Sequence, residues 1–212
     1  MPTHWYQEKK QEHFYKKAKQ KGYRARSAFK LLQIQKKFKV IKKRDTVLDL
    51  GAAPGSWSQI AKELVGDKGK VIGIDILQIK PLNEIIFLKG DMTKEESIKK
   101  ILNLTGENNV DIVLSDMSPD ISGNYTVDQA RSVFLCNQAV KTCDYLLKPG
   151  GNFVCKIFEG EDFPIFYKKI KNQFKNIRQF NPKASRKSSS EKYIIAKNYI
   201  KKPLKNNNKK LN

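Results

Sequence analysis

One lysine interrupts an apolar stretch in the last third of the chain. In FVCKIF (153–158), Lys156 has apolar neighbours on both sides, which is typical of a buried strand. Burying an ammonium group without a partner is costly, so such a lysine needs carboxylates close by. The pattern predicts that Lys156 belongs to a site where its charge is compensated and used.

Aspartates end three further strand-like stretches. KVIGID ends at Asp75, IIFLKGD at Asp91 and VDIVLSD at Asp116. Ligands bind at the carboxyl ends of the strands in parallel sheets, so we expect these side chains to surround one pocket. Asp75 follows Gly51 by twenty-four residues, the position where an acidic side chain accepts hydrogen bonds from ribose hydroxyls. The spacing favours a nucleoside site.

A glycine-rich turn, GAAPGSW (51–57), follows the first of these strands. Gly51 and Gly55 permit a tight turn and close approach to a ligand, and Ser56 is placed to cap the next helix. The turn is neither G-x-G-x-x-G nor a Walker A loop, and aspartates repel phosphates. The acidic pocket favours S-adenosylmethionine, which carries a sulfonium and an ammonium group. Trp57 can lie along the methionine chain or pack the helix on the sheet.

Strand and helix patterns alternate around these residues, which predicts an α/β fold. We expect a Rossmann-like, mostly parallel sheet of seven strands, with the last strand antiparallel and helices on both faces. The expected strands are 46–51, 70–75, 85–90, 110–116, 151–158, 176–181 and 191–197. The expected helices are 24–40, 56–66, 94–104, 127–148 (ended by Pro149-Gly150-Gly151) and 163–174.

This arrangement supplies partners for Lys156. The strand of Lys156 should lie beside the one that ends at Asp116. An antiparallel last strand would start next to these ends with Glu191, and Lys30 could reach the pocket from the first helix. Taken separately, Lys30 and Glu191 read as ordinary surface residues. Taken together, two lysines and two carboxylates would neutralise one another.

Basic charge is concentrated at the two ends of the chain. The formal net charge is +21, of which residues 1–44 hold +13 and residues 183–212 hold +9. This predicts an RNA partner, bound by a basic segment (1–25), with a catalytic domain (26–200) and a disordered basic tail (201–212). We expect Arg24 and Arg26, just before Lys30, to contact RNA beside the pocket.

The cysteines and histidines give no sign of a metal site. Cys136 and Cys143 follow helical spacing and Cys155 lies in a strand, so all three read as core residues. The sequence has neither a bilayer-spanning apolar run nor a signal peptide. We expect a cytoplasmic protein without membrane contact.

Five blocks of the sequence resemble one family in order. GYRARSAFKLLQI, VLDLGAAPGSWSQ, SDMSPDISG, GNFVCKIFEGEDF and KASRKSSSEKYIIAK are similar to the FtsJ/RrmJ family of RNA ribose 2′-O-methyltransferases, closest to its RlmE-type members. The resemblance covers about residues 10–200. It implies a monomeric S-adenosylmethionine-dependent enzyme that methylates a uridine in 23S ribosomal RNA of the large ribosomal subunit. Relatives that methylate the anticodon loop of tRNA remain an alternative.

The resemblance also implies roles for individual residues. The family's Lys-Asp-Lys-Glu catalytic set falls on Lys30, Asp116, Lys156 and Glu191, with Lys156 as proton acceptor or as a charged group that steers the hydroxyl. Its cofactor contacts fall on Gly55, Trp57, Asp75, Asp91 and Asp116, and we expect Gly51, where the glycine-rich turn begins, to join them. Two rival readings are an RNA-binding module with a degenerate pocket and a dinucleotide-dependent oxidoreductase. The complete catalytic set and the absence of G-x-G-x-x-G argue against them.

Overall fold

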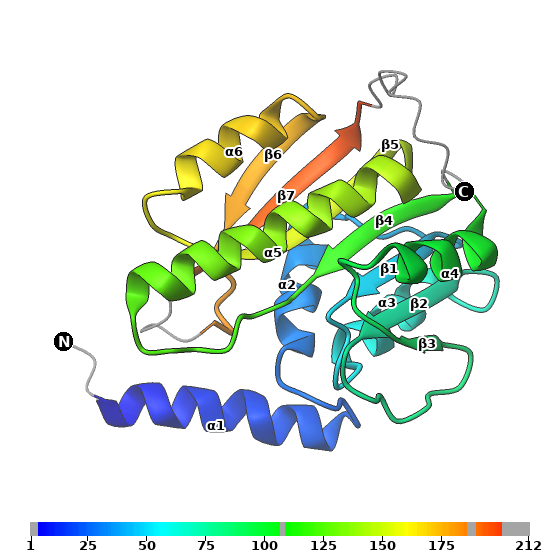
Figure 1. Ribbon diagram of the computed structural model, residues 1–212. Coiled ribbons are helices and arrows are strands. Elements are labelled where there is room, and N and C mark those ends of the chain that lie inside the picture. Colours follow the sequence, from blue (N-terminus) through cyan, green and yellow to red (C-terminus); the bar gives the residue numbers. More distant parts are fainter. Residues whose placement is uncertain (1–3, 107–108, 186–189, 201–212) are drawn as a thin grey trace.

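A computed structural model describes residues 4–106, 109–185 and 190–200, with side chains from residue 12 onward (Figure 1). One sheet of seven strands crosses the molecule in the order β3-β2-β1-β4-β5-β7-β6. All neighbouring pairs from β3 to β5 are parallel, and β7 is antiparallel to both β5 and β6. The strands are β1 (Thr46–Leu50), β2 (Lys70–Asp75), β3 (Ile86–Lys89), β4 (Val110–Ser115), β5 (Leu147–Phe158), β6 (Phe174–Phe180) and β7 (Glu191–Tyr199).

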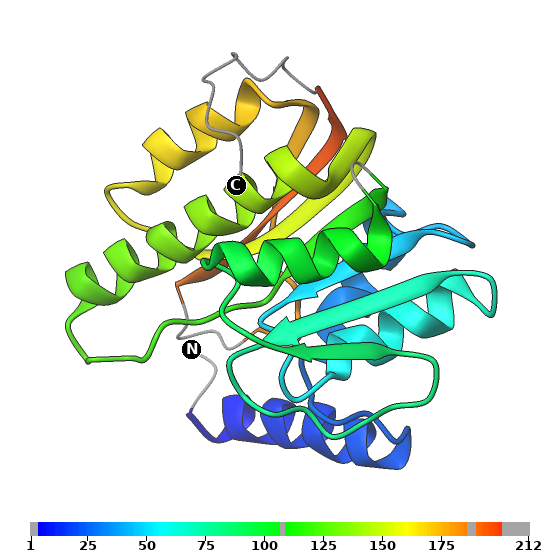
Figure 2. The same ribbon diagram turned by 45° about the vertical axis from the view of Figure 1, so that its right-hand side comes forward.

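Helices cover both faces of this sheet, as Figures 1 and 2 show. On one face, α4 (Glu95–Thr105), α5 (Tyr125–Leu146) and α6 (Phe163–Lys171) bury apolar side chains against residues such as Leu48 and Phe153. On the other face, α2 (Ala28–Phe38) and α3 (Ser56–Val65) pack against Val47 and Val154. The predicted mostly parallel sheet with an antiparallel last strand is confirmed.

The helix α1 (His4–Gln20) was not expected, because residues 1–25 showed no apolar stripe in the sequence. It runs along the lower edge of the molecule in Figures 1 and 2, apart from both helix layers. A small cluster holds it there: Ala18 packs with Phe29 and Ala184, and the ring of Phe14 lies 5.4 Å from that of Phe29. The described side chains that dock this helix, Phe14 and Ala18, lie in its second half.

The strand β5 begins four residues before the predicted start. The sequence pattern places Pro149-Gly150-Gly151 in a break after the helix, yet the strand runs through them. The pairing with β4 shifts between Val110↔Leu147 and Ile112↔Asn152, so these residues form an irregularity that adds chain on one strand only. Regular pairing resumes at Asn152 and carries Lys156 to the carboxyl end of the sheet.

The register of the last strand decides which side chains meet there. In the β5–β7 pair, Tyr193 lies directly opposite Lys156, and Glu191 lies opposite Phe158. Residues two apart on a strand share a face, so Glu191 and Tyr193 project to the same side as Lys156. Among the described residues, no helix is long and apolar enough to cross a membrane.

Candidate active site

Two buried lysines and two carboxylates meet at the carboxyl end of the sheet, as the sequence predicts. The Nζ of Lys156 donates a hydrogen bond to the backbone oxygen of Asp116 at 2.7 Å and lies 3.4 Å from its Oδ1. The Nζ of Lys30 lies 2.6 Å from Oε1 of Glu191. Lys30, Lys156 and Glu191 are each only 7–8% exposed, so these charges are compensated by one another instead of by water.

Tyr193 links the two ion pairs, and the sequence analysis missed it. Its hydroxyl donates to Oδ1 of Asp116 at 2.5 Å, and the Nζ of Lys30 lies 5.6 Å from its ring centroid. The ring is fully buried and stacks on Trp57. The sequence could have indicated it, because side chains alternate between the two faces of a strand. Tyr193 follows Glu191 by two residues and must therefore share its face.

Electrostatics keep these groups in defined protonation states. Burial acts to raise the pKa of Glu191, but the charge and hydrogen bond of Lys30 outweigh it and hold the pKa below its usual value. Burial, reinforced by the charge of Asp116, raises the pKa of Tyr193 well above its usual value. Glu191 is therefore a carboxylate and Tyr193 a neutral donor near pH 7.

The glycine-rich turn after β1 lies against the loop that follows β4. Gly51 has φ +69° and Gly55 has φ +106°, conformations that side chains rarely adopt. A Cβ on Gly51 would lie 2.3 Å from Cγ of Met117, just beyond β4, so the two loops pack directly on each other. The predicted cap of Ser56 is wrong: Gly55 caps α3, and the Ser56 Oγ lies 2.7 Å from the Ser27 Oγ.

The predicted ribose-binding carboxylate is fixed in place by backbone amides. The Oδ2 of Asp75 accepts from the N–H of Ala53 in the glycine-rich turn, and Oδ1 accepts from Leu77. Each oxygen keeps a further lone pair for a ligand hydroxyl. Asp91 accepts from the backbone and hydroxyl of Thr93, and the backbone bond is the main reason that its pKa is lowered. Asp75 is the last residue of β2, whereas Asp91 lies two residues beyond the end of β3.

Asp49 is a second residue that the sequence analysis missed. It is the last residue but one of β1, only 1% exposed, and its Oδ2 accepts from the hydroxyl of Ser58. Its Oδ1 is buried without a hydrogen-bond partner among the described residues. Burial, and next the charges of Asp116 and Asp75, raise the pKa of Asp49 to about 7. The sequence could have indicated Asp49 as it indicated Lys156, because each is a single charged residue within an apolar strand.

These donors and acceptors fit S-adenosylmethionine. Four carboxylates lie at or near the ends of β1, β2, β3 and β4, and one of their buried oxygens has no hydrogen-bond partner among the described residues. An anionic pocket of this kind suits a ligand with a sulfonium, an ammonium and ribose hydroxyls. Among the described residues there is no group of three or more His, Cys, Asp or Glu side chains that could hold a metal ion.

The remaining predicted residues lie around this pocket in other roles. Trp57 is buried, and its Nε1 donates to the backbone oxygen of Ser27, so its contacts are those of a core residue. The guanidinium of Arg24 donates to backbone carbonyls, and Arg26 is half-buried nearby. Cys136, predicted as a core residue, is buried and donates from Sγ to the backbone oxygen of Lys156.

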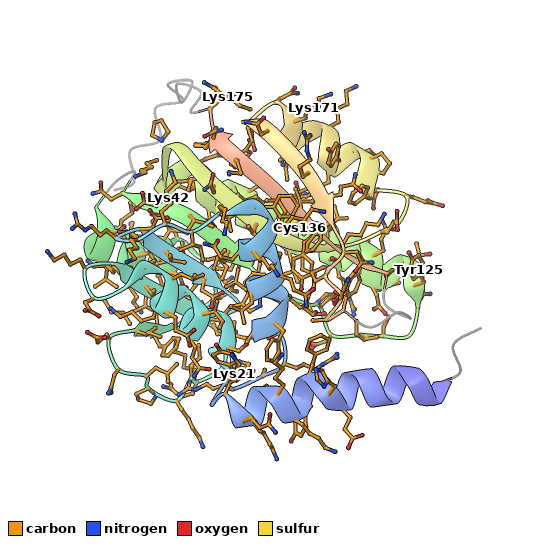
Figure 3. The ribbon with its side chains drawn as sticks, turned by 180° about the vertical axis from the view of Figure 1, so that it is seen from behind. Lys21, Lys42, Tyr125, Cys136, Lys171 and Lys175 are labelled. Carbon is orange, nitrogen blue, oxygen red and sulfur yellow. The ribbon has the colours of Figure 1, made fainter. Side chains whose placement is uncertain are left out.

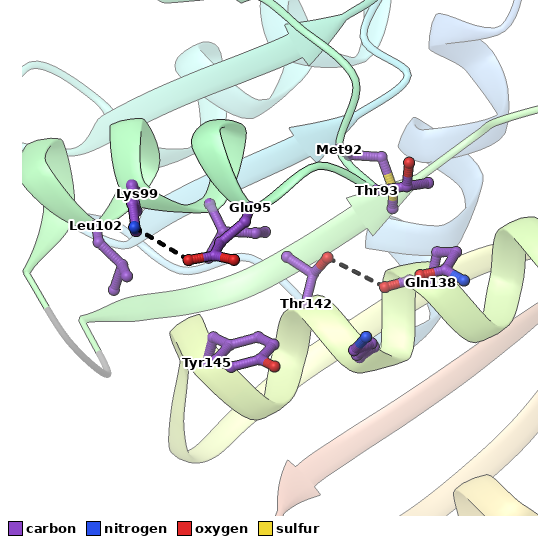
Figure 4. A pocket seen from close by; sticks show the side chains of 10 residues that line it. Met92, Thr93, Glu95, Lys99, Leu102, Gln138, Thr142 and Tyr145 are labelled. Carbon is purple, nitrogen blue, oxygen red and sulfur yellow. Dashed lines mark hydrogen bonds and ion pairs between the residues drawn. The ribbon is translucent and has the colours of Figure 1, made fainter. Parts of the chain in front are cut away.

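A separate groove of about 260 Å³ lies between α4 and α5 (Figure 4). It is lined by Met92, Thr93, Glu95, Ile98, Lys99, Leu102, Gln138, Lys141, Thr142 and Tyr145. None of the predicted site residues is among them. The groove touches the strand-end site only through Met92 and Thr93, which follow Asp91, so we do not assign the chemistry to it.

Known proteins share this sequence and fold. The FtsJ-like methyltransferase family model matches residues 23–199. A ribosomal RNA large subunit methyltransferase E of Acinetobacter baylyi is 49% identical over 82% of this chain and 80% of its own. One of Methanococcoides burtonii is 45% identical over 86% of this chain and 68% of its own.

A solved structure agrees with these sequence matches. A Plasmodium falciparum protein described as a ribosomal RNA methyltransferase superimposes with a TM-score of 0.77 at 27% identity, covering 85% of this chain and all of its own. The site residues, the sequence matches and the fold all indicate a methyltransferase. The chain is an enzyme that belongs to the FtsJ-like methyltransferase family.

Proposed function

We propose that this methyltransferase transfers a methyl group from S-adenosylmethionine to a ribose 2′-OH of large-subunit ribosomal RNA, most specifically a uridine of 23S ribosomal RNA. The observation that supports this proposal most strongly is the buried Lys156, which is held by Asp116 beside the Lys30–Glu191 pair and the glycine-rich turn. A ribose hydroxyl is a poor nucleophile at neutral pH. An amine aimed at the mouth of a nucleoside pocket is what its activation requires.

The residues divide the chemistry between them. In its neutral form, Lys156 would accept the proton of the 2′-hydroxyl at Nζ as that oxygen takes the methyl group. Asp116 and Tyr193 fix the direction of that nitrogen, while Glu191 neutralises Lys30 at the rim. In the alternative, Lys156 stays charged and steers the hydroxyl. In either case, positioning the hydroxyl in line with the methyl group supplies much of the rate.

The cofactor would be held by the strand ends. Asp75 would accept hydrogen bonds from the ribose hydroxyls, Asp91 would border the adenosine, and the turn from Gly51 to Gly55 would take the methionine part. When bound, S-adenosylmethionine supplies an electrophilic methyl group. Loss of the ribose contact in Asp75→Ala would weaken cofactor binding by about 1–3 kcal/mol.

The choice of ribosomal RNA rests on the relatives. Those named above are called ribosomal RNA large subunit methyltransferases, which favours this substrate over the tRNA anticodon loop. The basic ends of the chain, with Arg26 beside the pocket, supply charge for binding RNA phosphates. We further propose that the enzyme works as a monomer in the cytoplasm.

A competition assay tests the substrate. Purified protein receives methyl-labelled S-adenosylmethionine together with large-subunit particles, naked ribosomal RNA and unmodified tRNA, and the labelled RNA is digested to nucleosides. Label in a 2′-O-methyl nucleoside of large-subunit RNA supports the proposal. Label confined to tRNA would show that tRNA, and not ribosomal RNA, is the substrate. Label on a base would overturn the 2′-O chemistry.

A further inference from the structure

The side chain of Arg24 bridges two loops at the edge of the proposed cofactor site. Its Nη1 donates to the backbone oxygens of Pro54 at 2.9 Å and Lys80 at 2.6 Å, and its Nη2 donates to that of Pro81 at 2.8 Å. Pro54 lies in the glycine-rich turn after β1, whereas Lys80 and Pro81 lie in the loop 76–85 between β2 and β3. One guanidinium thus ties both loops together.

The contacts around Arg24 are close-packed. A Cβ on Gly55 would lie 3.0 Å from Nη1 of Arg24, so the glycine allows the guanidinium to reach the turn. The guanidinium carbon lies 6.0 Å from the ring centroid of Phe87 in β3. The backbone of Arg24 is also fixed, since its N–H donates to Oε1 of Gln59 in α3. Both the position and the direction of the side chain are therefore defined.

Both loops that Arg24 joins hold Asp75, a proposed cofactor contact, through backbone hydrogen bonds. In the glycine-rich turn the N–H of Ala53 donates to Oδ2 of Asp75, and in the loop 76–85 the N–H of Leu77 donates to Oδ1 of the same carboxylate. The loop has no regular secondary structure of its own. Three carbonyls that share one planar cation hold it against the turn, and without that cation they would lose those donors.

We infer that Arg24 is a positioning residue for the cofactor site, which holds the loop 76–85 in the conformation that binds S-adenosylmethionine. This inference rests on the proposed cofactor. It gives Arg24 a different task from the RNA contact that its charge suggested. Three of its five N–H donors are directed at backbone carbonyls, so most of its hydrogen-bonding capacity is used within the protein.

The test compares Arg24→Gln and Arg24→Lys with Lys21→Gln, which removes an exposed charge three residues earlier. Hydrogen exchange of the ligand-free proteins reports on the loop. Calorimetry without RNA gives the cofactor Kd, steady-state assays give KM and kcat, and filter binding gives the salt dependence of RNA affinity. We expect loop amides to exchange about tenfold faster in both Arg24 variants, because neither side chain can bridge three carbonyls.

The cofactor Kd and KM should rise about tenfold in both Arg24 variants, with kcat within about twofold of wild type. Lys21→Gln should leave exchange and cofactor affinity unchanged. Unaltered loop exchange and cofactor Kd in Arg24→Gln, together with a flatter RNA salt slope, would overturn the inference in favour of an RNA contact. Wild-type behaviour of Arg24→Lys would also overturn it. Failure of the wild-type protein to bind S-adenosylmethionine would instead refute the proposed function.

Discussion

At the scale of single residues, Tyr193 explains how a buried lysine and a buried aspartate keep one geometry. Lys156 and Tyr193 face each other across β5 and β7, and both reach Asp116. The tyrosine hydroxyl occupies one lone pair of Oδ1, which limits how the carboxylate can turn. Its raised pKa keeps it a donor throughout the working range.

Tyr193→Phe should slow methyl transfer about tenfold by freeing Asp116, and should cost about 1–2 kcal/mol of unfolding free energy for the lost bond to a charged group. Tyr199→Phe is the matched control, because Tyr199 donates to Asp144 at 2.7 Å from the other end of the same strand. Single-turnover rates and urea unfolding measure both effects. If the two variants kept equal activity, Tyr193 would have no role in positioning.

Asp49 should make the stability of the ligand-free protein depend on pH. Its pKa is raised to about 7 in the folded state, so that state holds a proton that the unfolded chain releases near pH 4. The stabilisation from this proton is present at low pH and is lost as pH rises through 7. Glu191 acts in the opposite sense, but only below its ordinary range, because its pKa is lowered.

Between pH 5 and 8 the free energy of unfolding should therefore fall by about 2–3 kcal/mol through Asp49 alone. Asp49→Asn keeps an acceptor for Ser58 and should remove this decline, whereas Asp67→Asn, at an exposed site, should retain it. Urea unfolding at several pH values gives the comparison. Parallel profiles for wild type and Asp49→Asn would show that Asp49 does not carry the effect.

Much of the candidate site could be predicted from the sequence because buried charge is conspicuous. Lys156 and Asp116 stand at the ends of apolar strands, and the alternating fold requires that such ends converge. Lys30 and Glu191 could be joined to them only through the fold and the family resemblance. The hydrogen bonds of Tyr193 and Arg24 depend on the register of β7 and on the path of a loop, which no local pattern encodes.

At the scale of elements, the strands were the most predictable part, and α1 the least. Strands buried on both sides read as apolar runs, whereas the sequence of α1 shows no apolar stripe, and among its described side chains Phe14 and Ala18 pack on the body. The start of β5 was also wrong by four residues, because Pro149 and Gly150 usually end an element. Here they lie in an irregularity where the partner strand makes no regular pairs.

The docking of α1 should depend on Phe14. Phe14→Ala removes the ring that packs on Phe29, so α1 should detach while the sheet remains folded. Hydrogen exchange should accelerate in α1 alone, cofactor affinity should stay within about twofold, and RNA affinity should fall about tenfold. Gln20→Ala, at an exposed position on the same helix, is the control. Unchanged exchange in Phe14→Ala would show that other contacts hold the helix.

At the scale of the whole molecule, a middle part of the chain with more acidic than basic side chains is flanked by two strongly basic parts. Residues 45–162 contain twelve basic and eighteen acidic side chains. Residues 163–212 contain fifteen basic side chains and one acidic side chain. The second basic region thus begins at α6, before residue 183, where the sequence analysis placed its start. Figure 3 shows Lys21 near the bottom of the molecule, Lys171 and Lys175 at the top, and Lys42 at one side. A large RNA can meet cations at both ends.

The most direct test of the account is the single-turnover rate of Lys156→Met with large-subunit particles and labelled S-adenosylmethionine. Methionine keeps an apolar stem of similar length but removes the ammonium. Lys148→Met, which breaks an ion pair with Asp111 at the other end of β5, is the control. The account predicts 2′-O-methyl label from wild type and control, and a rate at least about 100-fold lower for Lys156→Met, with cofactor affinity within a few fold. Near wild-type turnover by folded Lys156→Met would contradict it and leave Lys156 as a structural partner of Asp116.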